Sequence, residues 1–180
     1  MKNRKRNRLI GFDYSTHAIY FITICCDKRI QYFGEIQNNE MILNEFGTIA
    51  EKQIDWLQQQ YSYFNIHNYV VMPNHVHILF AINRTNVGTG RDLSMHNESQ
   101  SEMTGRDLSL QKIKSVSELI GAYKTTSSKM IHNAGNIPFK WQRSFFDNIV
   151  RDYESHNNIY NYIDRNPILW NDDSLKNPIM

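Results

Sequence analysis

The chain has 180 residues, a formal net charge of +2, and a composition that is 41% hydrophobic and 12% aromatic. These proportions exclude a wholly disordered or collagen-like chain, and the length favours a single domain. The two cysteines, Cys25 and Cys26, are adjacent, which excludes a disulfide framework and a CxxC zinc site. We therefore expect a soluble protein of a reducing, cytoplasmic compartment. Because no apolar run approaches the length of a membrane span, we expect no membrane partner.

The positive charge is concentrated at the N-terminus, where the first eight residues contain no acidic side chain. Five basic residues lie there: Lys2, Arg4, Lys5, Arg6 and Arg8. A basic arm of this kind suits contacts with nucleic-acid phosphates. A solvated terminus that merely aids solubility is an equally good interpretation of these residues alone.

The first third of the chain predicts strands and one helix. Residues 18–26 are rich in aromatic and β-branched side chains, which favours a buried strand. Residues 29–36 and 41–44 predict short strands joined by a turn. Asn44 is a suitable cap for a helix, because apolar side chains follow it at helical spacing.

The middle of the chain combines a hairpin with a long loop. Residues 64–72 and 75–83 are apolar runs separated by a Pro-Asn pair, which predicts a β-hairpin. A loop follows at about 84–110, and in it the motif TGRDLS begins at Thr89 and again at Thr104. Two copies are too few for a solenoid, so we interpret the repeat as a local duplication in a flexible loop in preference to a binding motif.

The last third predicts two helices around a short extended segment. Ser115 and Glu118 form the capping-box pattern of a helix that should end near Gly135. Residues 139–146 are aromatic and predict an extended segment, and residues 152–165 predict a final helix. The whole order of elements favours an α+β fold, in which an antiparallel sheet carries helices packed on one face.

His75 and His77 begin the second strand of the predicted hairpin. Because side chains alternate along a strand, both imidazoles should point to one face and Val76 to the other. Two neighbouring imidazoles can hold one divalent metal ion. The spacing fits equally well one buried and one surface histidine. None of the seven histidines is followed two residues later by Ser or Thr, which excludes a two-histidine phosphoesterase.

Two stripes run along the final predicted helix. The mostly polar stripe consists of Ser155, Asn158, Tyr162 and Asn166. The neighbouring stripe, which we expect to face the core, consists of Tyr153, His156, Tyr160 and Ile163. Tyr162 is thus the tyrosine least explained by packing, and Asn166 could offer its amide oxygen to a metal. A tyrosine beside a metal-bound phosphate can act as a nucleophile, but these residues alone favour an ordinary, partly buried aromatic.

Three blocks of sequence carry a resemblance to a known family. YVVMPNHVHIL, which begins at Tyr69, resembles the signature of the single-tyrosine HUH transposases. WQRSFFD from Trp141 and YIDRNP from Tyr162 resemble later blocks of its REP-associated tyrosine transposase branch. The blocks stand in family order, and the likeness extends from about residue 9 to residue 170.

The resemblance implies a ferredoxin-like fold with a C-terminal helix that carries the tyrosine. It also implies metal-dependent cleavage and rejoining of single-stranded DNA through a 5′-phosphotyrosine intermediate, as in DNA transposition. Matched by motif, Tyr162 is the nucleophile, and His75, His77 and Asn166 are the ligands of Mg²⁺ or Mn²⁺. Many relatives have glutamine where this chain has Asn166.

The expected partner is single-stranded or hairpin DNA in a bacterial, nucleoid-associated setting. The DNA-binding residues would be the basic arm together with Lys114, Lys124 and Arg143. The organisation would be an arm at 1–8, one catalytic domain at 9–170 and a tail at 171–180, in a monomer or a homodimer. The competing hypothesis is a non-catalytic single-stranded nucleic-acid-binding module, or a domesticated DNA-binding protein.

Overall fold

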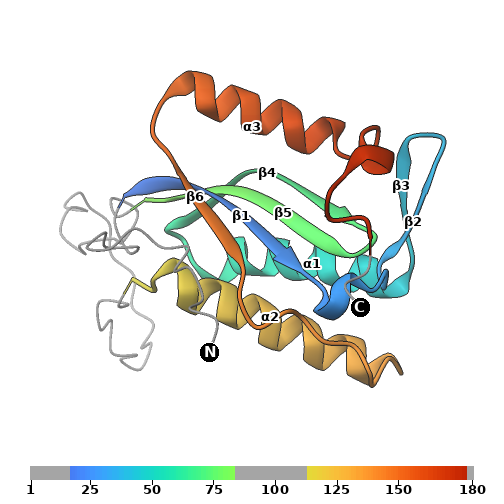
Figure 1. The fold of residues 1–180 in the computed structure, drawn as a ribbon. Helices are drawn as coiled ribbons and strands as arrows, with labels where there is room; N and C mark the ends of the chain where they lie inside the picture. The colour runs from blue at the N-terminus through green and yellow to red at the C-terminus, as the bar shows by residue number, and fades with distance from the viewer. Residues whose placement is uncertain (1–16, 84–112, 178–180) are drawn as a thin grey trace, which may run out of the picture.

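The computed structural model describes residues 17–83 and 113–177, and a four-stranded antiparallel sheet lies at its centre (Figure 1). The strand order is β4-β5-β1-β6. The strands are β1 (Ala18–Cys25), β4 (Phe64–Met72), β5 (His75–Ile82) and β6 (Phe146–Val150). Helices α1 (Glu45–Gln60) and α2 (Val116–Asn133) cover one face, and α3 (Tyr153–Arg165) lies on the other. This β-α-β-β-α-β arrangement with an added C-terminal helix confirms the expected ferredoxin-like α+β fold.

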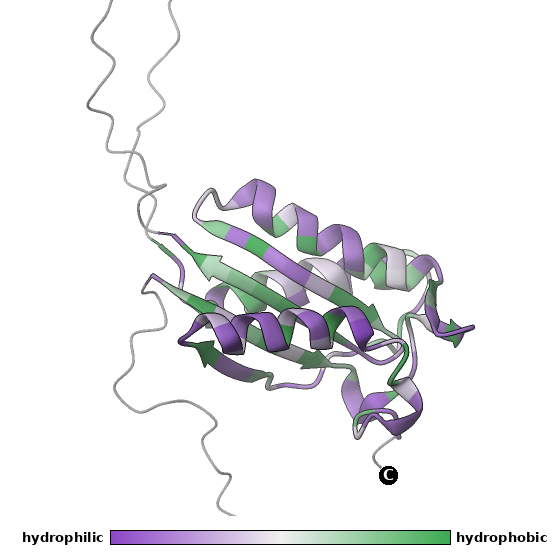
Figure 2. Cartoon of the chain, turned by 90° about the horizontal axis from the view of Figure 1, so that it is seen from above, coloured by the Kyte–Doolittle hydropathy of each residue, from purple (hydrophilic) through white to green (hydrophobic). Residues whose placement is uncertain are grey.

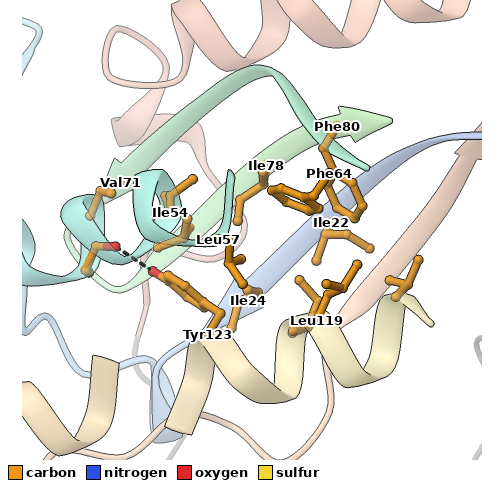
Figure 3. Packing of buried hydrophobic residues seen from close by; sticks show 14 of the residues in the cluster. Ile22, Ile24, Ile54, Leu57, Phe64, Val71, Ile78, Phe80, Leu119 and Tyr123 are labelled. Carbon is orange, nitrogen blue, oxygen red and sulfur yellow. Dashed lines mark hydrogen bonds between the residues drawn. The ribbon is translucent and has the colours of Figure 1, made fainter. Parts of the chain in front are cut away.

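Side chains alternate along β1, so they face two different layers of the molecule. Tyr20, Ile22 and Ile24 are fully buried in the main core against α1 and α2 (Figure 3). Phe21 and Thr23 point to the opposite face, on which α3 lies. Figure 2 shows that hydrophobic residues are concentrated in the strands, whereas the helices also carry hydrophilic residues. The sheet is therefore covered on both sides, so side chains on the α3 face can also be buried.

Strand β5 occupies the centre of this arrangement. All eight of its residues are buried, because it pairs with β4 on one side and with β1 on the other. It forms a hairpin with β4, as residues 64–83 predict. In the main core, the Tyr123 hydroxyl of α2 donates to the Ala50 carbonyl oxygen of α1 at 3.1 Å, which joins the two helices (Figure 3).

The helix starts predicted from local patterns are confirmed. The Asn44 side chain accepts a hydrogen bond from the Gly47 amide at 3.0 Å, at the start of α1. Ser115 and Glu118 form the complete capping box of α2. Each cap satisfies amide groups that have no partner within the helix itself.

The turn between the short strands is also confirmed. Strands β2 (Gly34–Gln37) and β3 (Glu40–Leu43) form a separate hairpin through Asn38 and Asn39. Both asparagines have a positive φ, of 50° and 65°, as the favoured two-residue hairpin turn requires.

The strand predicted from residue 29 begins only at Gly34. Asp27–Arg29 form a 3-10 helix instead. The amides of Tyr32 and Phe33 both donate to the Pro73 carbonyl oxygen, at 2.9 and 3.1 Å. The amides of these residues thus donate to the β4–β5 turn instead of to a neighbouring strand.

The prediction of an extended segment at 139–146 is wrong in position, because the strand lies after it. The strand β6 starts where that segment ends, at Phe146, and continues to Val150. The preceding residues have one isolated bridge, between Trp141 and Cys26. Phe139 and Trp141 pack against Phe33 at the core, with ring centroids 5.7 and 5.2 Å from it. The aromatic side chains therefore fill the end of the core, and β6 itself carries fewer of them.

Two sequence features lie outside the described residues: the basic arm at 1–8 and the duplicated TGRDLS motifs within 84–110. In the part of the chain that the structure does describe, no helix has the length and apolarity that a bilayer crossing requires.

Candidate functional site

The two histidines of β5 form the centre of a candidate site on the α3 face of the sheet. His75 and His77 are 0% and 2% exposed, and their Nε2 atoms lie 3.1 Å apart. Val76 points into the core on the other side of the strand. The shared face that the spacing predicts is therefore confirmed.

Hydrogen bonds from neighbouring turns fix the ring of His75. The Asn74 amide nitrogen donates to the carbonyl oxygens of Arg29 and Leu175, at 3.1 and 2.8 Å. The Asn74 Oδ1 atom is thus the acceptor for His75 Nδ1, at 2.8 Å. His75 consequently carries its proton on Nδ1, and the lone pair of Nε2 points into the site.

Strand β1 holds the ring of His77 in a similar way. His77 Nδ1 lies 2.8 Å from the hydroxyl of Thr23, its partner in the β1–β5 ladder. The ring also stacks on Phe21, with centroids 5.2 Å apart. Contacts of this type around a histidine select which nitrogen remains available to a ligand.

Both imidazoles are neutral at physiological pH. Burial lowers the pKa of His77 to about 3. Burial, reinforced by the neighbouring His77 ring, holds the pKa of His75 well below its usual value. Neutral imidazoles are the form that binds a metal ion.

Helix α3 brings the third and fourth predicted residues to the histidines. The Tyr162 hydroxyl lies 3.5 Å from His77 Nε2, and its ring meets Phe21 edge-on. Asn166, the C-cap of α3, is 2% exposed, and its Oδ1 atom is buried without a hydrogen-bond partner. The structure therefore brings together all four residues that the motifs single out, from segments 85 residues apart in the chain.

The environment of Tyr162 has opposing effects on its hydroxyl. Burial raises the pKa of Tyr162, and a hydrogen bond with Asn166 partly offsets this rise. Tyr160 has the same exposure, 39%, but its ring lies beside His156 on another side of the helix. The neighbours of the two tyrosines, and not their exposure, distinguish them.

The expected core-facing stripe of α3 is partly wrong. Tyr153 is 80% exposed, whereas Ile163 is buried against Leu79 and Val150, with Ile159 packed beside them. Tyr160 of the same stripe is exposed as well, whereas Tyr162 and Asn166 of the polar stripe lie at the histidines. The face of α3 that meets the sheet is thus rotated from the one that the pattern indicates.

Asp173 is a site residue that the motif analysis missed. Its side chain is 9% exposed, and its Oδ2 atom lies 3.7 Å from His75 Nε2. The surrounding segment is held by Arg29, which donates to the Ser174 carbonyl oxygen at 2.7 Å, and by Asn74. We expected only a tail at 171–180. Two consecutive aspartates shortly after Asn166 were the signal that could have indicated otherwise.

A pocket of about 280 Å³ lies beside these side chains. It is lined by Tyr162, Asn166, Leu169, Asp172, Asp173 and Ser174. Its walls thus combine the hydroxyl of α3 with the amide and carboxylate oxygens that follow it.

The donor atoms fit a divalent cation. Across residues 17–83 and 113–177, no three His, Cys, Asp or Glu side chains are already arranged around a metal position, so a cation at the two histidines would need a further oxygen ligand. Ligands ~2.1 Å from an octahedral ion and at right angles are ~3.0 Å apart, which matches the 3.1 Å between the histidine nitrogens. The unpartnered Asn166 Oδ1 supplies the oxygen ligand that Mg²⁺ or Mn²⁺ prefers.

The structure does not place the described candidate DNA-binding residues beside the histidines. Lys114 and Lys124 belong to the α2 side of the sheet, opposite α3 (Figure 1). Lys124 Nζ donates to the carbonyl oxygens of Gln142 and Ser144, and burial lowers its pKa to about 8. Arg143 is exposed in the connection to β6.

Comparisons with known proteins agree with this architecture. No protein-family model matches the sequence. An uncharacterized protein of Haemophilus influenzae is 29% identical over 173 residues, which cover 96% of this chain and 93% of that protein. The solved structure of a REP-associated tyrosine transposase bound to a REP hairpin superposes with a TM-score of 0.54 at 16% identity. That match covers 93% of this chain and 73% of the other, and it shows a shared fold.

Proposed function

We propose that this protein is a tyrosine HUH transposase, a single-stranded DNA endonuclease and strand transferase. The observation that carries the proposal is the convergence of the Tyr162 hydroxyl, the two neutral histidines and the unpartnered Asn166 oxygen on the α3 face of the sheet. The shared fold with a REP-associated tyrosine transposase supports it. Two of the three sequence blocks support it as well, because YVVMPNHVHIL contains the two histidines and YIDRNP contains Tyr162 and Asn166.

The proposed reaction begins with in-line attack by the Tyr162 hydroxyl oxygen on a DNA phosphorus atom. A bond forms between that oxygen and phosphorus, the bond from phosphorus to the 3′ oxygen breaks, and a 3′-OH leaves. The hydroxyl proton passes to water. A divalent cation held by His75, His77 and Asn166 would supply positive charge to the non-bridging phosphate oxygens. The reverse attack by another 3′-OH rejoins DNA without ATP.

The surroundings of Tyr162 suit a nucleophile that is protonated at rest. Its raised pKa keeps the hydroxyl protonated at neutral pH, so the proton must leave during the attack. The edge-on contact with Phe21 holds the ring in place, with the hydroxyl oxygen 3.5 Å from His77 Nε2. Positioning of this kind converts part of the activation entropy into a binding cost.

We propose single-stranded DNA that contains a hairpin as the substrate. The structurally similar transposase was solved with a REP hairpin, which supports this choice of ligand class. A folded hairpin presents both a duplex backbone and unpaired bases, and proteins read such ligands by shape, stacking and phosphate contacts.

The decisive experiment is a search for a covalent adduct. The protein is incubated with Mn²⁺ and single-stranded hairpin DNA from the flanks of its own gene, and the products are separated under denaturing conditions. We expect an adduct with the wild-type protein and none with Tyr162→Phe. Tyr160→Phe is the matched control, because it removes the same group from the same helix at equal exposure.

Mass spectrometry of the adduct locates the linked residue. A nucleotide on Tyr160 would overturn the assignment of Tyr162. DNA binding without any adduct would contradict the enzyme and support the non-catalytic binding module.

A further inference from the structure

The carboxylate of Asp173 has one oxygen atom that is buried and that no hydrogen-bond donor reaches. Its Oδ1 atom accepts a hydrogen bond from the Leu175 amide at 2.7 Å. Its Oδ2 atom is buried and has no hydrogen-bond partner. Among the residues that the structure describes, no lysine or arginine forms an ion pair with it. A buried, unpaired charge is unfavourable, so this oxygen requires an explanation.

The neighbouring ring of His75 offers this oxygen no hydrogen bond. His75 Nε2 lies 3.7 Å from Asp173 Oδ2. Because Asn74 Oδ1 accepts the proton of His75 Nδ1, the Nε2 atom presents a lone pair toward the carboxylate. Two electron-rich atoms thus face each other, and neither can donate to the other. A cation between them would remove the repulsion.

A second orphaned oxygen lies at the same pocket. Asn166 Oδ1 is buried and unpartnered, and Asn166 and Asp173 both line the cavity beside Tyr162. The amide oxygen of Asn166 and the carboxylate oxygen of Asp173 therefore lie at one pocket, beside the imidazole of His75. Carboxylate and amide oxygens are the ligands that hard divalent cations prefer.

We propose that Asp173 is a fourth ligand of the divalent cation, together with His75, His77 and Asn166. The inference rests on the metal site of the proposed function and adds the negatively charged group that the three motif residues lack. It assigns the segment after α3 to the site, where Asn74 and Arg29 hold it against the β4–β5 turn.

Mn²⁺ titration of the DNA-free protein, followed by the paramagnetic resonance signal of the unbound ion, tests this ligand. Asp173→Asn keeps the shape of the side chain but removes its charge, and we expect Mn²⁺ to bind at least about tenfold more weakly. Asp173→Ala, which removes both oxygens, should weaken binding further. Asp55→Asn is the matched control: it changes the same charge at an exposed position of α1, on the opposite face of the sheet, and its affinity should stay within about twofold of wild type.

Thermal unfolding provides a second readout. Without metal, Asp173→Asn should unfold at the same temperature as the wild type or a higher one, because it removes an unpaired buried charge. Added Mn²⁺ should raise the unfolding temperature of the wild type and of Asp55→Asn, but much less that of Asp173→Asn.

Equal Mn²⁺ affinity for the wild type and both Asp173 variants would overturn the inference. Failure of the wild type to bind millimolar Mn²⁺ would overturn it as well. Neither result decides the proposed function, which depends on the adduct at Tyr162 and is measured separately.

Discussion

The position of a tyrosine along α3 decides whether its hydroxyl reaches the histidines. Tyr160 and Tyr162 are equally exposed, yet only the Tyr162 hydroxyl approaches His77. They are two residues apart, which turns them ~200° from each other around the helix axis. One phosphate at the pocket therefore cannot be reached by both hydroxyls.

Removal of the Tyr162 hydroxyl should abolish chemistry without harming the fold. Tyr162→Phe loses the long 3.5 Å contact with His77 and the hydrogen bond with Asn166 at a partly exposed position, so the free energy of unfolding should fall by no more than ~1 kcal/mol. Urea unfolding measures this change, and a hairpin-DNA binding assay should give an unchanged affinity. A marked loss of stability would show that the hydroxyl has a structural role.

The buried histidines should make the protein sensitive to acid. His77 has a pKa of about 3 when folded, against an ordinary value of 6.5, so between these values the unfolded chain binds a proton that the folded chain does not. The contribution of neutral His77 to the free energy of unfolding is therefore complete above pH 6.5. It is lost as the pH falls toward 3, by up to ~1.4 kcal/mol per pH unit for this one residue.

Urea unfolding at several pH values checks this dependence. His77→Gln lacks the titrating group, so its stability should fall less steeply than that of the wild type between pH 6.5 and 4. Equal slopes for the two proteins would contradict the assignment of the effect to His77.

At the scale of elements, α3 matters because it carries both Tyr162 and Asn166. Its apolar attachment to the sheet is small and centres on Ile163 with Leu79 and Val150. Polar contacts from β4 add to it: the imidazoles of His67 and His156 lie 2.9 Å apart, and Asn68 reaches the helix. A helix attached in this way is sensitive to the loss of one polar contact.

Asn68→Ala should loosen α3. The Asn68 amide nitrogen donates to the Tyr160 carbonyl oxygen at 3.2 Å and to Asp164 Oδ1 at 2.8 Å. Loss of these bonds should cost about 1–2 kcal/mol and speed hydrogen exchange along α3. Asn65→Ala, at an exposed position of the same strand, is the control and should cost less than ~0.5 kcal/mol. Unchanged exchange in Asn68→Ala would show that the apolar contacts suffice.

At the scale of the whole molecule, charge is distributed unevenly along the chain. Without the five basic residues of the first eight, the net charge of +2 would become −3. Long-range attraction to DNA would then depend strongly on that segment.

Deletion of residues 1–8 tests this dependence. Each phosphate contact contributes ~0.7 to the slope of log affinity against log salt for single strands, so the deletion should flatten the slope by up to ~3.5. Measurement of hairpin-DNA affinity across a salt series gives both slopes. An unchanged slope would show that the arm serves only as a solubilising terminus.

The sequence by itself determined most elements and part of the site. The caps at Asn44 and Ser115 and the asparagine turn depend on contacts within about four residues, so local patterns were sufficient. The shared face of His75 and His77 followed from strand alternation in the same way. The motif resemblance added Tyr162 and Asn166, which no local pattern connects with the histidines.

The tertiary structure alone decided how α3 meets the sheet and what closes the site. Which stripe of a helix faces a sheet depends on its rotation and on where the sheet ends, which explains why Tyr153 is exposed although its stripe is apolar. Asp173 reaches His75 because Asn74 and Arg29, far away in sequence, bind the carbonyl groups around it. Contacts between such distant segments depend on the closure of long loops, which a local sequence pattern does not encode.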